Sequence, residues 1–287
     1  MKLTLTILTI LLIASLSHAE PWETSVDANL LFSQNAYSNN WTGGETGSAT
    51  WTFNANLSAR KQLSERLRNR NTLKLAFGQT HSQDESTRDW KEPAKSTDLI
   101  DFESLLRYKT RAFFNPFAAL RFESQFIDLS DTTKWRNINP LKFTESLGLT
   151  RVFWDEEKRQ LNARLGLGIR QFIDRDRLVT AVPLTRETKT TNDAGLELVS
   201  EIATPLLQEK VSYTGKVTLF QALYYSEESS TNDFWKAVDV NWENIFTANI
   251  TDYLMVNLYM QLLYDKEIAL GGRFKQTLSL GLTWKML

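Results

Sequence analysis

The sequence predicts an all-β fold: one antiparallel transmembrane β-barrel of about twelve strands, with short periplasmic turns and long extracellular loops. Three observations predict it. Apolar and polar residues alternate along most of the chain, and the connections between the alternating segments are short and long in turn. The polar face of these segments also carries many charges.

Alternation is clearest near the C-terminal end, where Leu278, Leu280, Leu282 and Trp284 are separated by small or polar residues. Successive side chains of a strand point to opposite faces, so a period of two predicts a strand. The same period predicts strands at 23–34, 47–61, 67–79, 97–113, 116–128, 143–154, 160–173, 191–204, 209–224, 236–250, 253–265 and 273–287.

The connections between these segments fall into two classes that alternate along the chain. Short connections are expected near 63–66, 115–116, 155–158, 206–210 and 251–252. Long polar connections are expected near 34–47, 80–97, 131–142, 174–192, 226–235 and 266–273. Outer-membrane barrels are built with short periplasmic turns and longer external loops, and an even number of strands leaves both termini in the periplasm.

The charged face of the segments separates a membrane barrel from a soluble sandwich. In 97–113, Ile100 and Phe102 point one way while charged residues point the other, so both faces cannot be a dry core. An apolar face toward lipid and a wet lumen fit this pattern. The predicted lumen-lining residues are Asp101, Glu103, Arg107, Lys109, Arg111, Arg121, Glu123, Arg164, Arg170, Asp193, Glu197, Glu201, Lys216, Asp239, Glu243 and Lys275.

The alternation fails at Arg151, and the apolar phase slips by one at the C-terminal end, 284–287. Arg151 continues the phase of Leu147 and Leu149, so it would face lipid. That position would cost roughly 2–4 kcal/mol at the middle of the membrane. A β-bulge is therefore expected at Arg151.

The N-terminal segment is typical of a cleaved signal peptide. Lys2 precedes an apolar stretch at 3–16 that is too short to span a bilayer as a helix. Small residues, Ser17 and Ala19, occupy the third and first positions before the expected cut. We expect cleavage after Ala19, with 20–287 forming a single barrel domain in the outer membrane. Its expected partners are outer-membrane lipid and the barrel assembly machinery, although the usual terminal aromatic residue is absent.

Composition excludes several other classes of protein. The 33 basic and 34 acidic residues nearly balance, so no nucleic-acid partner is indicated. Since the chain has no Cys, it can have neither a disulfide nor a lipoprotein anchor. No second long apolar run follows the N-terminal segment, so membrane insertion requires a closed barrel.

A motif near the N-terminus resembles a known family. The sequence Asn39-Asn40-Trp41-Thr42-Gly43-Gly44-Glu45 follows the first predicted strand, and further matches occur at 95–98, 125–126, 139–140 and 146–148. The pattern resembles a family of outer-membrane barrels catalogued only as domain of unknown function 3078. The resemblance implies an outer-membrane barrel and supplies no catalytic residue. In the motif, Asn40, Gly43 and Gly44 suit a tight loop, with Trp41 packing over the barrel mouth or contacting a ligand.

Three functional classes remain open. The first is a channel or transporter for small polar solutes, which the charged lumen favours. The second is a structural or interaction barrel, in which the charges of mixed sign pair and fill the lumen. The third is an outer-membrane hydrolase that uses His81, expected in a loop with Asp84 and Glu85. With no Cys and one His outside the predicted signal peptide, no transition-metal site or cofactor is expected.

Overall fold

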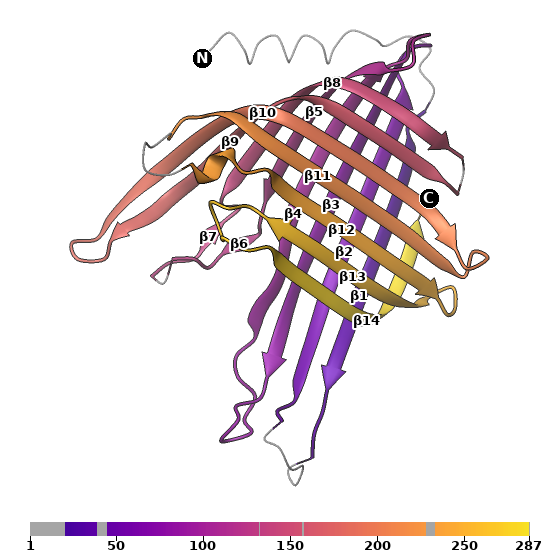
Figure 1. The fold of residues 1–287 in the computed structure, drawn as a ribbon. Coiled ribbons are helices and arrows are strands. Elements are labelled where there is room, and N and C mark those ends of the chain that lie inside the picture. The colour runs from indigo at the N-terminus through magenta and orange to yellow at the C-terminus, as the bar shows by residue number, and fades with distance from the viewer. Residues whose placement is uncertain (1–20, 39–44, 132, 157, 228–232, 287) are drawn as a thin grey trace.

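Strand pairing closes the chain into a barrel in the computed structural model, which describes residues 21–38, 45–131, 133–156, 158–227 and 233–286. Twelve strands of the described residues pair antiparallel in chain order, and β14 pairs with β1 to complete the ring (Figure 1). They are β1 (Glu23–Asn35), β2 (Ser48–Gln62), β3 (Leu67–Ser82), β4 (Ala94–Tyr108), β5 (Asn115–Ser124), β8 (Leu141–Asp155), β9 (Gln160–Thr180), β10 (Thr185–Leu206), β11 (Val211–Tyr225), β12 (Asp239–Asn249), β13 (Leu254–Tyr264) and β14 (Arg273–Met286). The predicted fold class is thus confirmed.

Three short elements lie outside the barrel wall. Strands β6 (Ile127–Asp128) and β7 (Arg136–Asn137) form a small hairpin in the connection between β5 and β8. A 3-10 turn, η1 (Phe234–Lys236), precedes β12. No helix among the described residues is long and apolar enough to cross a membrane. The predicted signal peptide and the first-loop residues Asn40, Trp41, Gly43 and Gly44 lie outside the described residues.

Two predicted segments had wrong bounds. Residues 174–180 and 185–192 form the ends of β9 and β10, joined by a turn at 181–184, rather than a long loop, and this hairpin projects beyond the barrel (Figure 1). In the projecting part, β9 and β10 pair only with each other and not with β8 or β11. This part therefore does not face lipid, and its sequence lacks the apolar alternation that marks the other strands. Strand β4 ends at Tyr108 rather than 113, because the Asn115 side chain accepts the Thr110 N–H at 2.8 Å and turns the chain.

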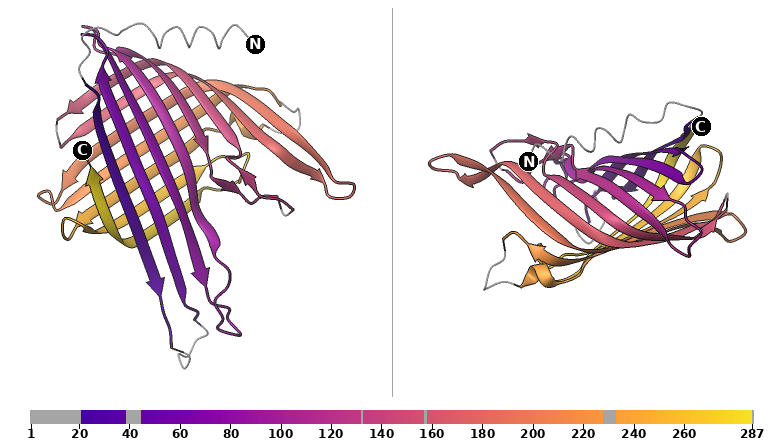
Figure 2. Two further views of the ribbon diagram at one scale, coloured as in Figure 1. Left: turned by 180° about the vertical axis from the view of Figure 1, so that it is seen from behind. Right: turned by 90° about the horizontal axis from the view of Figure 1, so that it is seen from above.

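The barrel has two walls whose strands cross steeply. Figure 2 shows β1 to β5 running across β9 to β13, with the ends of β1 to β4 and the β9–β10 hairpin projecting in different directions.

Two neighbouring strands approach closely at a pair of glycines, because Gly148 lies opposite Gly166 in the register of β8 and β9. A Cβ on Gly148 would lie 2.2 Å from the backbone oxygen of Leu165, so only glycine permits this close strand approach.

The outer surface is apolar and the inner surface is polar. Leu147 is 66% exposed on the outside, and Leu167, Phe274 and Leu278 are similarly exposed. Buried residues include many polar ones on the inner face, among them Asp101. A wall that is apolar outside and polar inside is the arrangement of a transmembrane barrel.

Arg151 lies on the outer face at the end with the short turns. The bulge lies between Val152 and Trp154, next to the position expected from the sequence, and it does not turn Arg151 inward. Instead Arg151 donates to the Phe113 carbonyl at 2.7 Å, and its guanidinium lies 4.1 Å from the centre of the Phe113 ring. The charge is therefore tied to the barrel rim rather than placed at mid-membrane.

Candidate functional site

The inner face of the barrel gathers most of the charges predicted to line the lumen. The register aligns them from strand to strand: Glu103 of β4 lies opposite Arg121 of β5, and Arg170 of β9 opposite Asp193 of β10. The inward-facing set is Asp101, Glu103, Arg107, Arg121, Glu123, Arg164, Arg170, Asp193, Glu197, Glu201, Lys216, Asp239, Glu243 and Lys275.

The prediction was wrong for Lys109 and Arg111. Both follow the end of β4 and are exposed in the turn before β5, so they do not line the lumen. Conversely, the inward-facing Arg68, Arg70 and Lys74 of β3 were not predicted. They alternate with Asn69, Asn71 and Leu73, so the period of two in that strand was the signal that could have found them.

A central cluster of five charges joins the two walls across the lumen. Arg70 of β3 donates to Glu201 of β10 at 2.7 Å, although five strand boundaries separate these strands around the barrel. Arg164 of β9 donates two hydrogen bonds to Glu103 of β4, which also lies 3.5 Å from Arg70. Lys216 of β11 lies 3.6 Å from Glu201. Side chains alone therefore bridge the lumen at this level.

The members of the central cluster differ in their access to water. Glu103 and Arg164 are only 3% and 4% exposed, so their pair is buried. The side chains of Arg70 and Glu201 are each 21% exposed. A pair that water reaches is held less strongly than a dry one, because the solvent screens the charges.

Two further clusters lie along the lumen wall. Arg121 donates to both carboxylate oxygens of Asp101 at 2.8 Å and lies 3.1 Å from Glu123. Arg170 binds Asp193 in the same bidentate way, with a closest distance of 2.5 Å, and reaches Asp239 at 2.7 Å. Two-point binding of a planar guanidinium fixes its orientation. Asp101, Glu123 and Asp193 lie on the same strand as their arginine or on the neighbouring one, whereas Asp239 lies on β12, three strands from Arg170 of β9.

Two more contacts cross the lumen between strands that are not neighbours. Lys74 of β3 lies 3.7 Å from Glu243 of β12. Lys275 of β14 donates to the Ser96 carbonyl at 3.2 Å and to the Thr97 hydroxyl at 3.0 Å, both on β4. The lumen of this barrel is thus narrow and braced by long side chains.

The connection between β5 and β8 is anchored to the base of the projecting hairpin. Arg136 of β7 donates to Asp128 at 2.5 Å and to Asp174 of β9 at 2.7 Å. The amide of Asn139, only 1% exposed, bridges the same two carboxylates at 2.8 Å each. This polar network holds the loop against one end of the barrel.

A second anchor of this loop is expected to respond to acid. The Thr133 N–H and hydroxyl donate to Asp131 at 2.8 Å, and Arg186 donates at 2.5 Å, which together lower the pKa of Asp131 to about 2. Because this pKa lies below the unfolded value of about 3.9, the contact is fully present above about pH 4. It is lost as the pH falls through about 2. Carboxyl ¹³C titration should give this midpoint, and a midpoint near 4 would contradict the anchor.

His81 lies in β3, not in a loop as expected from the sequence. It is opposite Ala49 in the register. Within the described part of the chain, no hydrogen bond or ion pair joins it to a Ser hydroxyl or a carboxylate, while Asp84 is engaged by Ser86 and Lys91. The described residues also contain no group of three or more His, Cys, Asp or Glu side chains placed to hold a metal.

Comparison with known proteins identifies a family over part of the chain. Residues 32–128 match the family described as "Protein of unknown function (DUF3078)". No curated protein matches the chain. The match includes the first-loop motif and the segments at 95–98 and 125–126, whereas 139–140 and 146–148 lie beyond it.

The similarity of the chain to solved structures is low. The chain is similar to an outer-membrane channel from Pseudomonas putida F1, with 15% identity over 93% of this chain and 96% of that chain and a TM-score of 0.44. It is also similar to the translocator domain of autotransporter NalP from Neisseria meningitidis, with 10% identity over 99% and 95% and a TM-score of 0.39. At such TM-scores the likeness supports no conclusion about function. The family resemblance predicted from the sequence is confirmed over residues 32–128, in a family of proteins of unknown function.

Proposed function

We propose that this chain is an outer-membrane barrel that acts as a narrow channel for small polar solutes and is held closed at rest by its lumen-crossing ion pairs. The observation that carries the proposal is the water-accessible pair between Arg70 and Glu201, 2.7 Å apart on opposite walls. Flexible side chains close this level of the lumen, and they can move apart without any strand moving. Charged residues at a constriction are a recurring means of selecting solutes in channels.

The orientation in the membrane follows from the connections. Glu23 at the start of β1 lies opposite Arg60, close to the short turn after β2, and β14 ends beside β1. Both ends of the described barrel therefore lie at the end with the short turns. In the proposal this end faces the periplasm, because the short turns of outer-membrane barrels are periplasmic.

Conductance of the refolded barrel in planar bilayers tests the channel. The double variant Arg70→Ser/Glu201→Ser removes both charges of the accessible pair and shortens both side chains. We expect infrequent small openings in the wild type and roughly a twofold or larger gain in mean conductance in the variant, because the lumen is wider at that level.

The matched control is Arg177→Ser/Glu187→Ser, which removes another Arg–Glu pair, 2.5 Å apart, on the projecting hairpin outside the lumen. This control should conduct like the wild type. If neither the wild type nor the Arg70→Ser/Glu201→Ser variant conducts, the channel is ruled out.

The second candidate is a structural or interaction barrel without transport. It is favoured by the buried pair of Glu103 and Arg164 and by the projecting β9–β10 hairpin, whose tip exposes Val182 and Leu184. This candidate predicts that neither the wild type nor the Arg70→Ser/Glu201→Ser variant conducts.

A further inference from the structure

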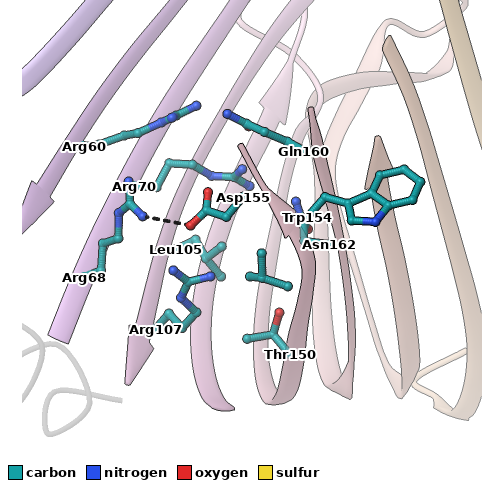
Figure 3. A pocket seen from close by; sticks show the side chains of 11 residues that line it. Arg60, Arg68, Arg70, Leu105, Arg107, Thr150, Trp154, Asp155, Gln160 and Asn162 are labelled. Carbon is teal, nitrogen blue, oxygen red and sulfur yellow. Dashed lines mark ion pairs between the residues drawn. The ribbon is translucent and has the colours of Figure 1, made fainter. Parts of the chain in front are cut away.

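The end of the lumen near the short turns carries an unbalanced group of four arginines, here called the basic vestibule: Arg60 of β2, Arg68 and Arg70 of β3, and Arg107 of β4. They line a cavity of about 70 Å³. Figure 3 shows their side chains converging there, with Asp155 among them and the Gln160 and Asn162 amides on the far side. Three neighbouring strands thus present guanidinium groups to one space.

The register places these like charges directly against one another. Arg60 lies opposite Arg70, and Arg68 lies opposite Arg107. Like charges in directly opposed positions of a sheet repel and destabilise the pairing. The chain maintains two such pairs side by side, so a compensating negative charge is needed in the space between them.

The carboxylates of the described residues supply only part of this compensation. Asp155 is 3.7 Å from Arg68 and is itself largely exposed, while Arg70 is engaged by Glu201 and Glu103 in the central cluster. Glu23 lies opposite Arg60 in the register without forming an ion pair. Within the described residues neither Arg60 nor Arg107 has an ion-pair partner, so two guanidinium groups remain available.

We propose that the basic vestibule binds a small oxyanion of the phosphate class. A guanidinium group donates two parallel hydrogen bonds to a phosphate or carboxylate. A tetrahedral oxyanion can accept from several strands at once, whereas a monocarboxylate has only two oxygens to share. The cavity is several times the roughly 10–15 Å³ that one water molecule needs, so a small anion can enter.

The inference that this oxyanion is the solute of the channel rests on the proposed function. Binding of the anion to the basic vestibule is measured independently of conduction. Titration calorimetry of the refolded full chain in neutral detergent, at low ionic strength, uses inorganic phosphate as the probe. Acetate serves as the carboxylate probe. We expect phosphate to bind more tightly than acetate, and binding to weaken as sodium chloride is added.

The test variant is Arg60→Gln/Arg107→Gln. Each removed guanidinium should weaken phosphate binding by about tenfold, which is the usual size for a charge-assisted hydrogen bond. The matched control is Arg177→Gln/Lys189→Gln, which removes two positive charges from the projecting hairpin and should leave the affinity within about twofold, because neither side chain lines the cavity or can donate a hydrogen bond to an anion in it.

Folding of each variant is checked by the shift between boiled and unboiled samples on a denaturing gel. Without phosphate, Arg60→Gln/Arg107→Gln should melt at or above the wild-type temperature, because the opposed like charges are relieved. A lower melting temperature without loss of phosphate affinity would show that these arginines support the fold, and would overturn the site.

The outcomes separate the site from the channel. If phosphate binds but the barrel never conducts, the anion site is supported and the channel proposal is wrong. If the barrel conducts but phosphate does not bind, the anion site is wrong and the channel proposal stands. Equal binding of acetate and phosphate, or unchanged phosphate affinity in Arg60→Gln/Arg107→Gln, also overturns the assignment.

Discussion

Replacing Glu103 with Ala is expected to destabilise the barrel by about 3–5 kcal/mol, the usual cost of removing one partner from a buried ion pair. The Glu103 carboxylate is 3% exposed and is shared by Arg164 and Arg70. Its loss leaves the buried Arg164 guanidinium with no carboxylate in hydrogen-bond contact among the described residues. Urea unfolding in lipid vesicles, followed by tryptophan fluorescence, measures the change in the free energy of unfolding.

The control for this prediction is Glu187→Ala. Glu187 also pairs with an arginine, Arg177, but both side chains are well exposed on the projecting hairpin. Exposed pairs contribute about 0–1 kcal/mol, so this change should be small. The double variant Glu103→Ala/Arg164→Met should recover much of the lost stability, because no buried charge is left without a partner. If Glu103→Ala cost no more than Glu187→Ala, the central cluster would not hold the two walls together.

Replacing Gly148 with Ala is expected to prevent correct closure of the barrel, at a cost of about 3 kcal/mol or more, the upper range for overpacking. The added Cβ would meet the Leu165 oxygen at 2.2 Å and the Gly166 Cα at 2.4 Å. Both are backbone atoms of the neighbouring strand, so no rotamer change relieves the clash. Strands β8 and β9 must separate and lose hydrogen bonds.

The measurement for Gly148→Ala is the fraction of refolded protein that migrates differently when unboiled, together with its resistance to protease. Gly271→Ala is the matched control, since a Cβ there would have nothing within 4 Å. It should refold like the wild type. A Gly148→Ala protein that folds as completely as Gly271→Ala would show that the close approach of β8 and β9 is not required.

The sequence by itself determined the strands and their two faces. Lipid outside and a polar interior impose a period of two, so Leu165 and Leu167 alternate with Arg164 and Gly166 wherever the chain crosses the wall. This local pattern was enough to predict the barrel and to assign Glu103, Arg164 and Glu201 to the inner face. It failed at Lys109 and Arg111, where a hydrogen bond from the Thr110 N–H to the Asn115 side chain ends β4 before the alternation ends.

Only the tertiary structure decided which inward-facing charges meet. Alternation assigns a residue to a face, but it does not say which strand lies opposite across the lumen, because that depends on the register of every strand pair and on the crossing of the two walls. Arg70 and Glu201 are 131 positions apart, and their contact crosses the lumen. The same geometry leaves Arg60 and Arg107 without ion-pair partners among the described residues, in a cavity near the short turns. The period of the sequence therefore determined the barrel, and the way its walls pack decided which charges pair across the lumen and which arginines are left without an ion-pair partner among the described residues.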